Sequence, residues 1–219
     1  MRSISQNKQQ LKSILDNLST IIFDLGGVLI DLDTSRSVKT FALLSGLSEK
    51  EVYSKFLDDG WSYAFEKGEI DSATFRNEVR KSLGIEVSDN QIDQAWNEML
   101  LDIPYARLKM VADLRNKYQL FVLSNTNAIH IEAFNRKVAV STNGGIITDY
   151  FDKVYYSNEL GMRKPDTEIF AHVIAANNLN PQQTLFIDDM ENNIIGAQSV
   201  GLRTVHLSNQ DYLTELFSE

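Results

Sequence analysis

The feature that most constrains this chain is a short apolar run at residues 20–23 that ends at a lone carboxylate, Asp24. Gly26 and Gly27 follow it closely. A run this short, rich in β-branched and aromatic residues, is typical of a buried strand in a parallel sheet. Such a strand delivers the next residue to the carboxyl edge of the sheet, where the sites of open α/β sheets lie. We therefore expect Asp24 to be a nucleophile or a metal ligand.

Four further apolar runs share this character. They lie at residues 120–123, 154–156, 185–187 and, more weakly, 204–207, and helical patterns separate them. Strands that alternate with helices imply a parallel sheet with helices on both faces. The sequence therefore predicts an α/β fold built on a Rossmann-like parallel sheet.

Residues 34–103 show helical patterns without any strand-like run. Ser48 and Ser88 each begin a capping box, which marks a helix start. Apolar residues then recur at helical spacing, among them Leu57, which predicts the core of a helical bundle. We expect this helical domain to be inserted into an α/β core made of residues 1–33 and 104–219. A short polar helix over residues 5–18 would precede the first strand.

Composition and charge exclude several classes of function. The chain has no cysteine, so disulfides, thiolate catalysis and cysteine-bound metals are excluded. Its formal charge of -9 makes it a poor partner for nucleic acid or an anionic membrane. No apolar stretch reaches transmembrane length, and the N-terminus has no apolar signal core. We expect a cytoplasmic protein, either a monomer or a homodimer.

Polar side chains follow four of the predicted strands. In chain order they are Asp24; Ser124 and Asn125; Lys164; and Asp188 and Asp189. Each motif alone is weak, because a Ser-Asn pair often caps a helix and a Lys-Pro pair often forms a turn. Adjacent aspartates are a stronger signal, since like charges repel without a cation. At one edge of a sheet, these groups would combine a carboxylate nucleophile, a hydroxyl, an ammonium and a metal site.

This combination meets the needs of phosphoryl transfer, in which catalysis is mostly positioning and electrostatic stabilisation. Asp24 would attack phosphorus, and water would then hydrolyse the aspartyl-phosphate. Mg²⁺ suits hard oxygen ligands and would bridge Asp24, Asp189 and the phosphoryl group. Ser124, with nearby backbone N–H groups, and Lys164 would hold the phosphoryl oxygens. The expected substrate is a small phosphate ester.

These motifs resemble those of the haloacid dehalogenase-like hydrolase superfamily. Its first to fourth motifs are matched by Asp24-Leu25-Gly26-Gly27-Val28, Ser124-Asn125, Lys164-Pro165 and Asp188-Asp189. The helical insertion resembles the C1 cap of this superfamily. The residues at 65–70, 124–127 and 161–165 are similar to those of the α-D-glucose-1-phosphate phosphatase subgroup, which implies a sugar phosphate substrate.

The resemblance also implies a role for each site residue. Mg²⁺ would be bound by the carboxylates of Asp24 and Asp189 and by the backbone carbonyl of Gly26, with Asp188 in support. The phosphoryl group would be held by Ser124, Asn125 and Lys164. Arg36, near the start of the cap, is a further candidate for substrate binding, although an exposed helix residue is the simpler interpretation. Trp61, Tyr63, Glu66 and Glu69 are weaker candidates from the cap.

One departure from the family pattern concerns acid catalysis. Phosphatases of the superfamily usually carry a second aspartate two residues after the nucleophile, and this chain has Gly26 there. A positioned acid or base contributes ~10²- to 10⁴-fold to the rate. The substrate could have a good leaving group, as an anomeric phosphate does; Asp31 or Asp33 could substitute; or the protein could be slow or inactive.

Two alternative functions follow from these features. The missing aspartate favours a catalytically weak protein that binds a phosphorylated metabolite. A 2-haloacid dehalogenase, which attacks carbon and needs no metal, belongs to the same superfamily. Asp188 and Asp189 argue against the dehalogenase, because two uncompensated carboxylates would repel a carboxylate substrate.

Overall fold

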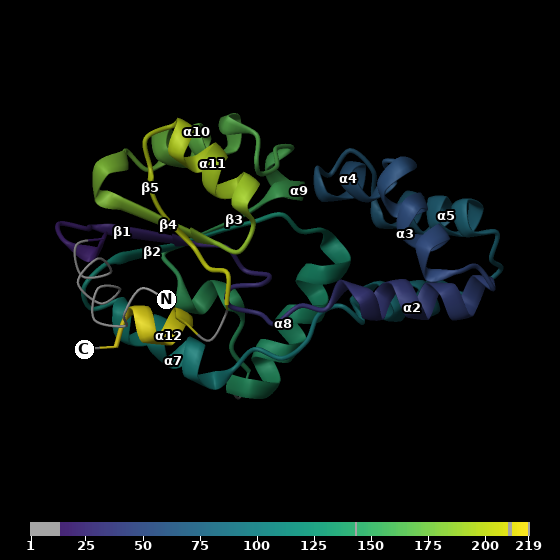
Figure 1. Ribbon diagram of the computed structural model, residues 1–219. Helices are drawn as coiled ribbons and strands as arrows, with labels where there is room; N and C mark the ends of the chain where they lie inside the picture. Colours follow the sequence, from purple (N-terminus) through teal and green to yellow (C-terminus); the bar gives the residue numbers. More distant parts are fainter. Residues whose placement is uncertain (1–13, 143, 210–211, 219) are drawn as a thin grey trace, which may run out of the picture.

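The computed structural model describes residues 14–142, 144–209 and 212–218 (Figure 1). Of the helix predicted over residues 5–18, the part before residue 14 lies outside these ranges. The described residues form a five-stranded sheet in the order β3-β2-β1-β4-β5, and every strand pair is parallel. The strands are β1 (Thr20–Phe23), β2 (Gln119–Ser124), β3 (Lys153–Tyr156), β4 (Thr184–Asp188) and β5 (Arg203–His206). The predicted parallel α/β sheet is confirmed.

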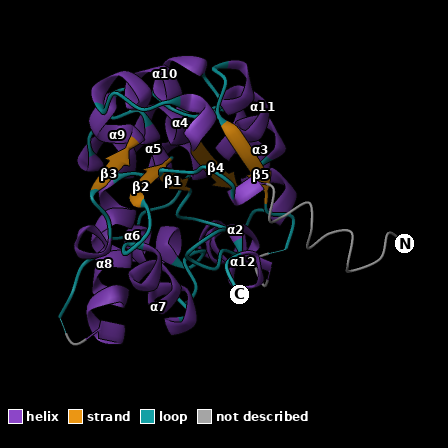
Figure 2. Ribbon diagram, turned by 90° about the vertical axis from the view of Figure 1, so that its left-hand side faces the viewer, coloured by secondary structure: helices purple, strands orange, loops and turns teal. Residues whose placement is uncertain are grey.

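Helices cover both faces of the sheet, as predicted. One face carries α7 (Tyr105–Leu114), α8 (Ala128–Thr142) and α12 (Tyr212–Leu216), and the other carries α10 (Thr167–Ala176) and α11 (Glu191–Ser199). Figure 2 shows the strands between these two layers. The shorter helices are α9 (Ser157–Leu160), η1 (Ile147–Tyr150) and η2 (Pro181–Gln183).

The apolar run of β1 is continuous because both of its faces are buried. Ile21 and Phe23 pack in the layer of α7 and α8, whereas Ile22 packs in the layer of α10 and α11. Successive side chains of a strand point to opposite faces, so a strand covered on both sides needs apolar residues throughout. This double burial holds the central strand, and the residue that follows it, in a fixed position.

A helical insertion lies between β1 and β2, to one side of the sheet (Figure 1). Its helices are α2 (Thr34–Ser45), α3 (Glu49–Asp58), α4 (Trp61–Glu66), α5 (Ser72–Leu83) and α6 (Asp89–Asn97). Both predicted capping boxes form, at Ser48 and at Ser88. Aromatic rings fill the centre of the insertion, where Phe65 stacks on Phe75 with centroids 4.3 Å apart. We refer to this insertion as the cap.

Leu57 departs from its predicted place in the bundle core. Its side chain is 45% exposed and lines a cavity between the cap and the sheet. Helical spacing identifies the apolar face of a helix but not which apolar residues border a cavity.

Among the described residues, no helix is both long and apolar enough to cross a membrane.

Candidate active site

Asp24 directly follows the central strand, at the carboxyl edge of the sheet. Its backbone N–H donates to the carbonyl of Ile187 at 2.9 Å, which extends the pairing of β1 with β4 by one residue. Its Oδ1 accepts a hydrogen bond from the N–H of Leu25 at 2.7 Å. The backbone on both sides of Asp24 is therefore fixed, and so is one oxygen of its carboxylate.

Lys164 joins two of the predicted site carboxylates. Its Nζ lies 2.8 Å from Oδ1 of Asp24 and donates to Oδ2 of Asp188 at 2.7 Å. Burial lowers the pKa of Lys164, but the charges of Asp24 and Asp188 outweigh this effect, and the net pKa is raised. The side chain is only 1% exposed. Lys164 therefore carries a buried positive charge at the centre of the site.

Asn125 holds the backbone of Lys164 in place. The N–H of Lys164 donates to Oδ1 of Asn125 at 2.9 Å, and Nδ2 of Asn125 donates back to the carbonyl of Lys164 at 2.8 Å. This pair of bonds connects the loop after β2 with the loop after α9. Asn125 thus helps to position the ammonium of Lys164. From the sequence, Asn125 was expected only to bind phosphate.

Asp188 and Asp189 complete a cluster of three carboxylates with Asp24. One oxygen from each of the three lies within 4.8 Å of the others. Asp188 ends β4, and both of its oxygens accept bonds from Nδ2 of Asn193 at 3.0 Å. The cluster is therefore preformed by strand ends and by a helix side chain.

The electrostatics of this cluster favour a cation. Burial raises the pKa of Asp24 to about 8, with Lys164 opposing the shift and Asp188 reinforcing it. Burial, and then the charge of Asp188, also raise the pKa of Asp189. One ammonium cannot compensate three clustered carboxylates, of which Asp24 and Asp188 are buried and Asp189 is partly buried, and hard oxygen donors are the ligands that Mg²⁺ prefers. The residues present fit a magnesium ion.

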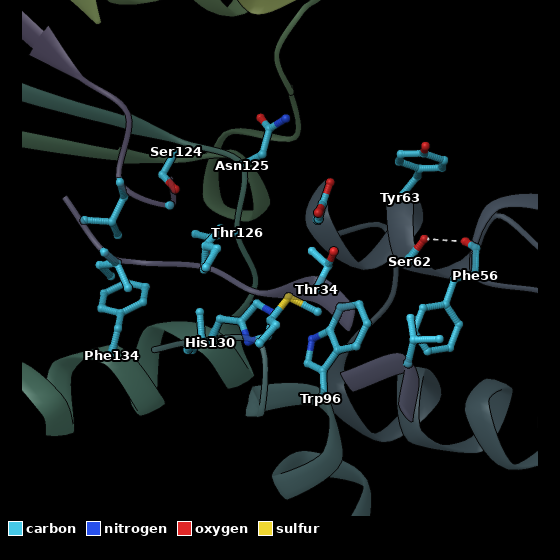
Figure 3. Close-up of a pocket in the computed structure, with 18 of the residues that line it drawn as sticks. Thr34, Phe56, Ser62, Tyr63, Trp96, Ser124, Asn125, Thr126, His130 and Phe134 are labelled. Atoms are coloured by element: carbon cyan, nitrogen blue, oxygen red, sulfur yellow. Dashed lines mark hydrogen bonds between the residues drawn. The ribbon is translucent and has the colours of Figure 1, made fainter. Parts of the chain in front are cut away.

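Ser124 and Asn125 lie at the end of β2, the strand beside β1. Together with Thr126 they precede α8 and border a cavity of about 340 Å³ between the sheet and the cap (Figure 3). Leu25 and Gly26 border the same cavity from the loop after β1. The loop that follows Asp24 and the loop that follows β2 therefore border one space.

Comparisons with known proteins decide the family. Residues 18–201 match the haloacid dehalogenase-like hydrolases. This chain belongs to that family. The D-ribitol-5-phosphate phosphatase of Bacteroides thetaiotaomicron is 31% identical to this hydrolase over 91% of this chain and 97% of its own.

Solved structures agree with this assignment. A HAD family enzyme of Bacteroides thetaiotaomicron is 38% identical, with a TM-score of 0.85 over 92% of this hydrolase and 99% of that chain. The same enzyme, as wild-type protein in complex with magnesium and inorganic phosphate, gives a second match at 40% identity. Its TM-score is 0.76 over 86% of this hydrolase and 93% of that chain.

Three residues considered from the sequence lie apart from the cavity of the hydrolase. Arg36 pairs with Glu98 at 3.3 Å, and both side chains are about half exposed. Asp31 accepts a bond from Nη1 of Arg107 at 2.6 Å, and Asp33 caps α2 by accepting from the N–H of Ser35 at 3.1 Å. These three do not line this cavity, and neither do Asp24, Lys164, Asp188 and Asp189. Asp31 lines a second cavity, together with Gly27 and Asp189. The carboxylates of Asp31 and Asp33 are engaged in structural contacts instead.

The position of the missing aspartate has an apolar neighbour. A Cβ built on Gly26 would lie 2.6 Å from Cδ1 of Leu32, which also lines the cavity. Leu32 therefore occupies space that a side chain at position 26 would need. A side chain at position 26 would first have to displace the Leu32 methyl group.

His130 lies in α8 and borders the cavity. Its ring stacks on Trp96 with centroids 5.1 Å apart and planes 5° apart, and its Nδ1 lies 2.8 Å from Oδ1 of Asn97. Burial lowers the pKa of His130 to about 3. The imidazole is therefore neutral at physiological pH, which makes it a poor proton donor for a leaving group.

Proposed function

We propose that this hydrolase is a magnesium-dependent phosphatase of small phosphorylated metabolites, with sugar or sugar-alcohol phosphates as its substrates. The observation that carries the proposal is the contact of one buried ammonium, Lys164, with the carboxylates of both Asp24 and Asp188 at 2.8 and 2.7 Å. A rigid carboxylate beside a fixed positive charge and a preformed cation site is what phosphoryl transfer requires.

Asp24 is the proposed nucleophile. Its carboxylate oxygen forms a bond to phosphorus while the ester P–O bond breaks, which gives an aspartyl-phosphate and an alkoxide that takes a proton from water. Water then attacks phosphorus, and the P–O bond to Asp24 breaks, which releases inorganic phosphate and restores the carboxylate. Lys164 stabilises the negative charge on the phosphoryl oxygens in both steps.

The remaining residues hold the reacting groups. Ser124 and Asn125 are proposed to bind phosphoryl oxygens, and Asn125 also holds the backbone of Lys164. Mg²⁺ would be held by Asp24, Asp189 and the carbonyl of Gly26, with Asp188 in support. When bound, Mg²⁺ supplies positive charge that neutralises the phosphate ester and the carboxylates. The role of Arg36 as a substrate ligand stays a prediction.

The proposed substrate class rests on the relatives and on the cavity. The relative that acts on D-ribitol 5-phosphate points to a sugar-alcohol phosphate. The motifs similar to the glucose-1-phosphate phosphatase subgroup point to a sugar phosphate. A cavity of about 340 Å³ is at the small end of ligand pockets, which suits a substrate of this size. We propose that residues 34–103 act as the cap that selects the leaving group.

A catalytically weak binding protein is the second candidate. The contacts of Asp31 with Arg107 and of Asp33 with Ser35 favour it, because they engage the two carboxylates that could replace the missing acid. Such a protein would bind a phosphorylated metabolite tightly, without turnover at any pH in the presence of Mg²⁺. A dehalogenase is disfavoured, because three clustered carboxylates repel a haloacid.

Hydrolysis of an aryl phosphate by the wild-type protein and by Asp24→Asn tests the proposal. We expect turnover that needs Mg²⁺, stops with a chelator and is lost in Asp24→Asn. Undiminished hydrolysis by the variant would rule out Asp24 as nucleophile. A screen of phosphorylated sugars, sugar alcohols and other metabolites then identifies the substrate.

A further inference from the structure

Glu66 joins the cap to the core beside the candidate active site. It is the last residue of α4, and its Oε2 accepts a bond from Nη2 of Arg163 at 2.9 Å. Its carbonyl accepts a bond from Oγ of Ser157, in α9, at 2.6 Å. In Figure 1, α4 and α9 lie next to each other across this junction. The backbone and the carboxylate of Glu66 are therefore both fixed against the core.

The turn after Glu66 packs closely against the core. Gly68 has φ of 67°, and a Cβ built on it would lie 2.1 Å from the carbonyl oxygen of Asn158. The backbone of the cap thus touches the backbone of the core two residues beyond Glu66. Glu66 therefore lies in the cavity wall at a point where the cap and the core are in close contact.

Glu66 is the charged member of the cavity wall. The residues that line the cavity all fall in the described part of the chain, and among them are no lysine and no arginine. The walls around Glu66 are mainly aromatic or aliphatic, with Tyr63, Phe56 and Trp96 on the cap side (Figure 3). Ser62, another polar residue of this wall, already donates to the carbonyl of Phe56 at 2.8 Å.

Both cations near this wall are already paired. Arg163 binds Glu66, and its Cζ lies 4.4 Å from the ring centroid of Tyr63. Lys164 lies between Asp24 and Asp188. An anionic group on the leaving alcohol would therefore meet the Glu66 carboxylate, and no lysine or arginine of the lining could compensate its charge. A hydroxyl group could instead donate a charge-assisted hydrogen bond to that carboxylate.

Resting on the phosphatase function proposed above, we propose that Glu66 is a specificity-determining residue. It selects phosphate monoesters whose alcohol part is uncharged and carries a hydroxyl group, and it rejects those with a carboxylate or a second phosphate. Rejection of a like charge is a common route to specificity, because it weakens the wrong ligand without demanding more from the right one.

A matched pair of compounds tests the proposal. Glycerol 3-phosphate and 3-phosphoglycerate differ in that a CH₂OH group in the first is a carboxylate in the second. With saturating Mg²⁺, we expect the wild-type protein to favour glycerol 3-phosphate at least tenfold in kcat/KM. Glu66→Gln should reduce this ratio at least fivefold, by a gain for 3-phosphoglycerate and a loss for glycerol 3-phosphate. If neither compound is turned over, the ratio of their inhibition constants against an aryl phosphate is measured instead.

Two further variants separate selection from a structural role. Glu86→Gln removes an exposed glutamate of the cap that does not line the cavity, and should leave the ratio unchanged. Arg163→Met removes the cation paired with Glu66 but keeps the carboxylate, so the preference for glycerol 3-phosphate should rise, whereas a purely structural role of Glu66 would lower activity on both compounds in the same proportion. A ratio unaltered by Glu66→Gln would overturn the proposal. An absence of Mg²⁺-dependent aryl phosphate hydrolysis in the wild type would instead refute the phosphatase function itself.

Discussion

Gly27 lies directly against the carboxylate of Asp189: a Cβ built on Gly27 would be 2.3 Å from Oδ2 of Asp189. Gly27 also has φ of 76°, a conformation that side chains rarely adopt. The loop after β1 and the end of β4 therefore approach each other so closely that only glycine fits. This approach is what brings Asp189 to within reach of Asp24.

Gly27→Ala should therefore weaken the cation site selectively. The added methyl group must displace Asp189, so we expect the Mg²⁺ concentration for half-maximal activity to rise at least tenfold. Magnesium titration of activity, or calorimetry, measures this. Gly46→Ala is a matched control, because Gly46 has φ of 71° with nothing within 4 Å of its Cβ position. Each substitution costs about 1 kcal/mol in backbone strain, so the two variants differ in the contact with Asp189 and not in strain. Equal Mg²⁺ dependence of activity in both variants would contradict the role given to Gly27.

A second prediction concerns Lys164. Lys164→Met leaves Asp24 and Asp188 buried without their cation, and removal of one partner of a buried ion pair typically destabilises by about 3–5 kcal/mol. Urea unfolding measures this loss, and added Mg²⁺ should restore more stability to the variant than to the wild type, because ions that bind the native state stabilise it. Activity should fall at least 100-fold.

Lys109→Met provides the comparison. Lys109 contacts Asp113 at 2.8 Å, as short as the contact of Lys164 with Asp24. In contrast to that buried pair, the side chains of Lys109 and Asp113 are both exposed. Exposed ion pairs contribute about 0–1 kcal/mol. If the two methionine variants lost similar amounts of stability, burial would not be the source of the electrostatic energy at the site.

The first strand and the position of Asp24 at its end could be recognised from the sequence because their pattern is local. A buried parallel strand must be apolar throughout, so a carboxylate directly after it, as at Asp24, stands out. The capping boxes of the cap are likewise local signals. The convergence of strand ends then follows from the topology of any parallel sheet, which is why Lys164 and Asp188 could be expected near Asp24.

The contacts across the cap and core could not be predicted in this way. Glu66 and Arg163 are far apart in the chain, and nothing in either segment indicates that they pair. Arg36 was a candidate substrate ligand from its position near the start of the cap, and its pairing with Glu98 likewise has no local signal in the sequence. Side-chain direction on a helix depends on how the whole helix is rotated against its neighbours, and a local pattern does not specify that rotation.

The buried His130 gives a prediction for stability against pH. Its pKa is about 3 in the folded protein and near 6.5 in an unfolded chain. Between these values the unfolded chain binds the extra proton, so stability is complete above pH 6.5 and falls as the pH drops toward 3. From pH 7 to pH 5, this one group should remove about 2 kcal/mol.

Urea unfolding of the wild type and of His130→Gln, at pH 7 and at pH 5, isolates this contribution. Other groups titrate in both proteins, so the quantity of interest is the difference between the two pH dependences. We expect the variant to lose about 2 kcal/mol less than the wild type over this range. Parallel pH dependences would mean that His130 is protonated in the native state, contrary to its burial against Trp96.

The last prediction concerns the missing acid. A carboxylate at position 26 would need the space of Leu32, because Cδ1 of that residue lies 2.6 Å from the Cβ position. The backbone at Gly26 is not in the left-handed region, so an aspartate is compatible with it. We therefore expect Gly26→Asp combined with Leu32→Ala to introduce a general acid, whereas Gly26→Asp alone should disturb the loop.

The gain should depend on the leaving group. An alkoxide needs a proton when it departs and a nitrophenolate does not, so the double variant should speed hydrolysis of an alkyl phosphate by ~10-fold or more, toward the ~10²- to 10⁴-fold typical of a positioned acid. Hydrolysis of p-nitrophenyl phosphate should change little, and Leu32→Ala alone should show no such selectivity. An equal gain on both substrates would indicate a change in cavity shape, and no gain on either would mean that departure of the leaving group does not limit the native enzyme.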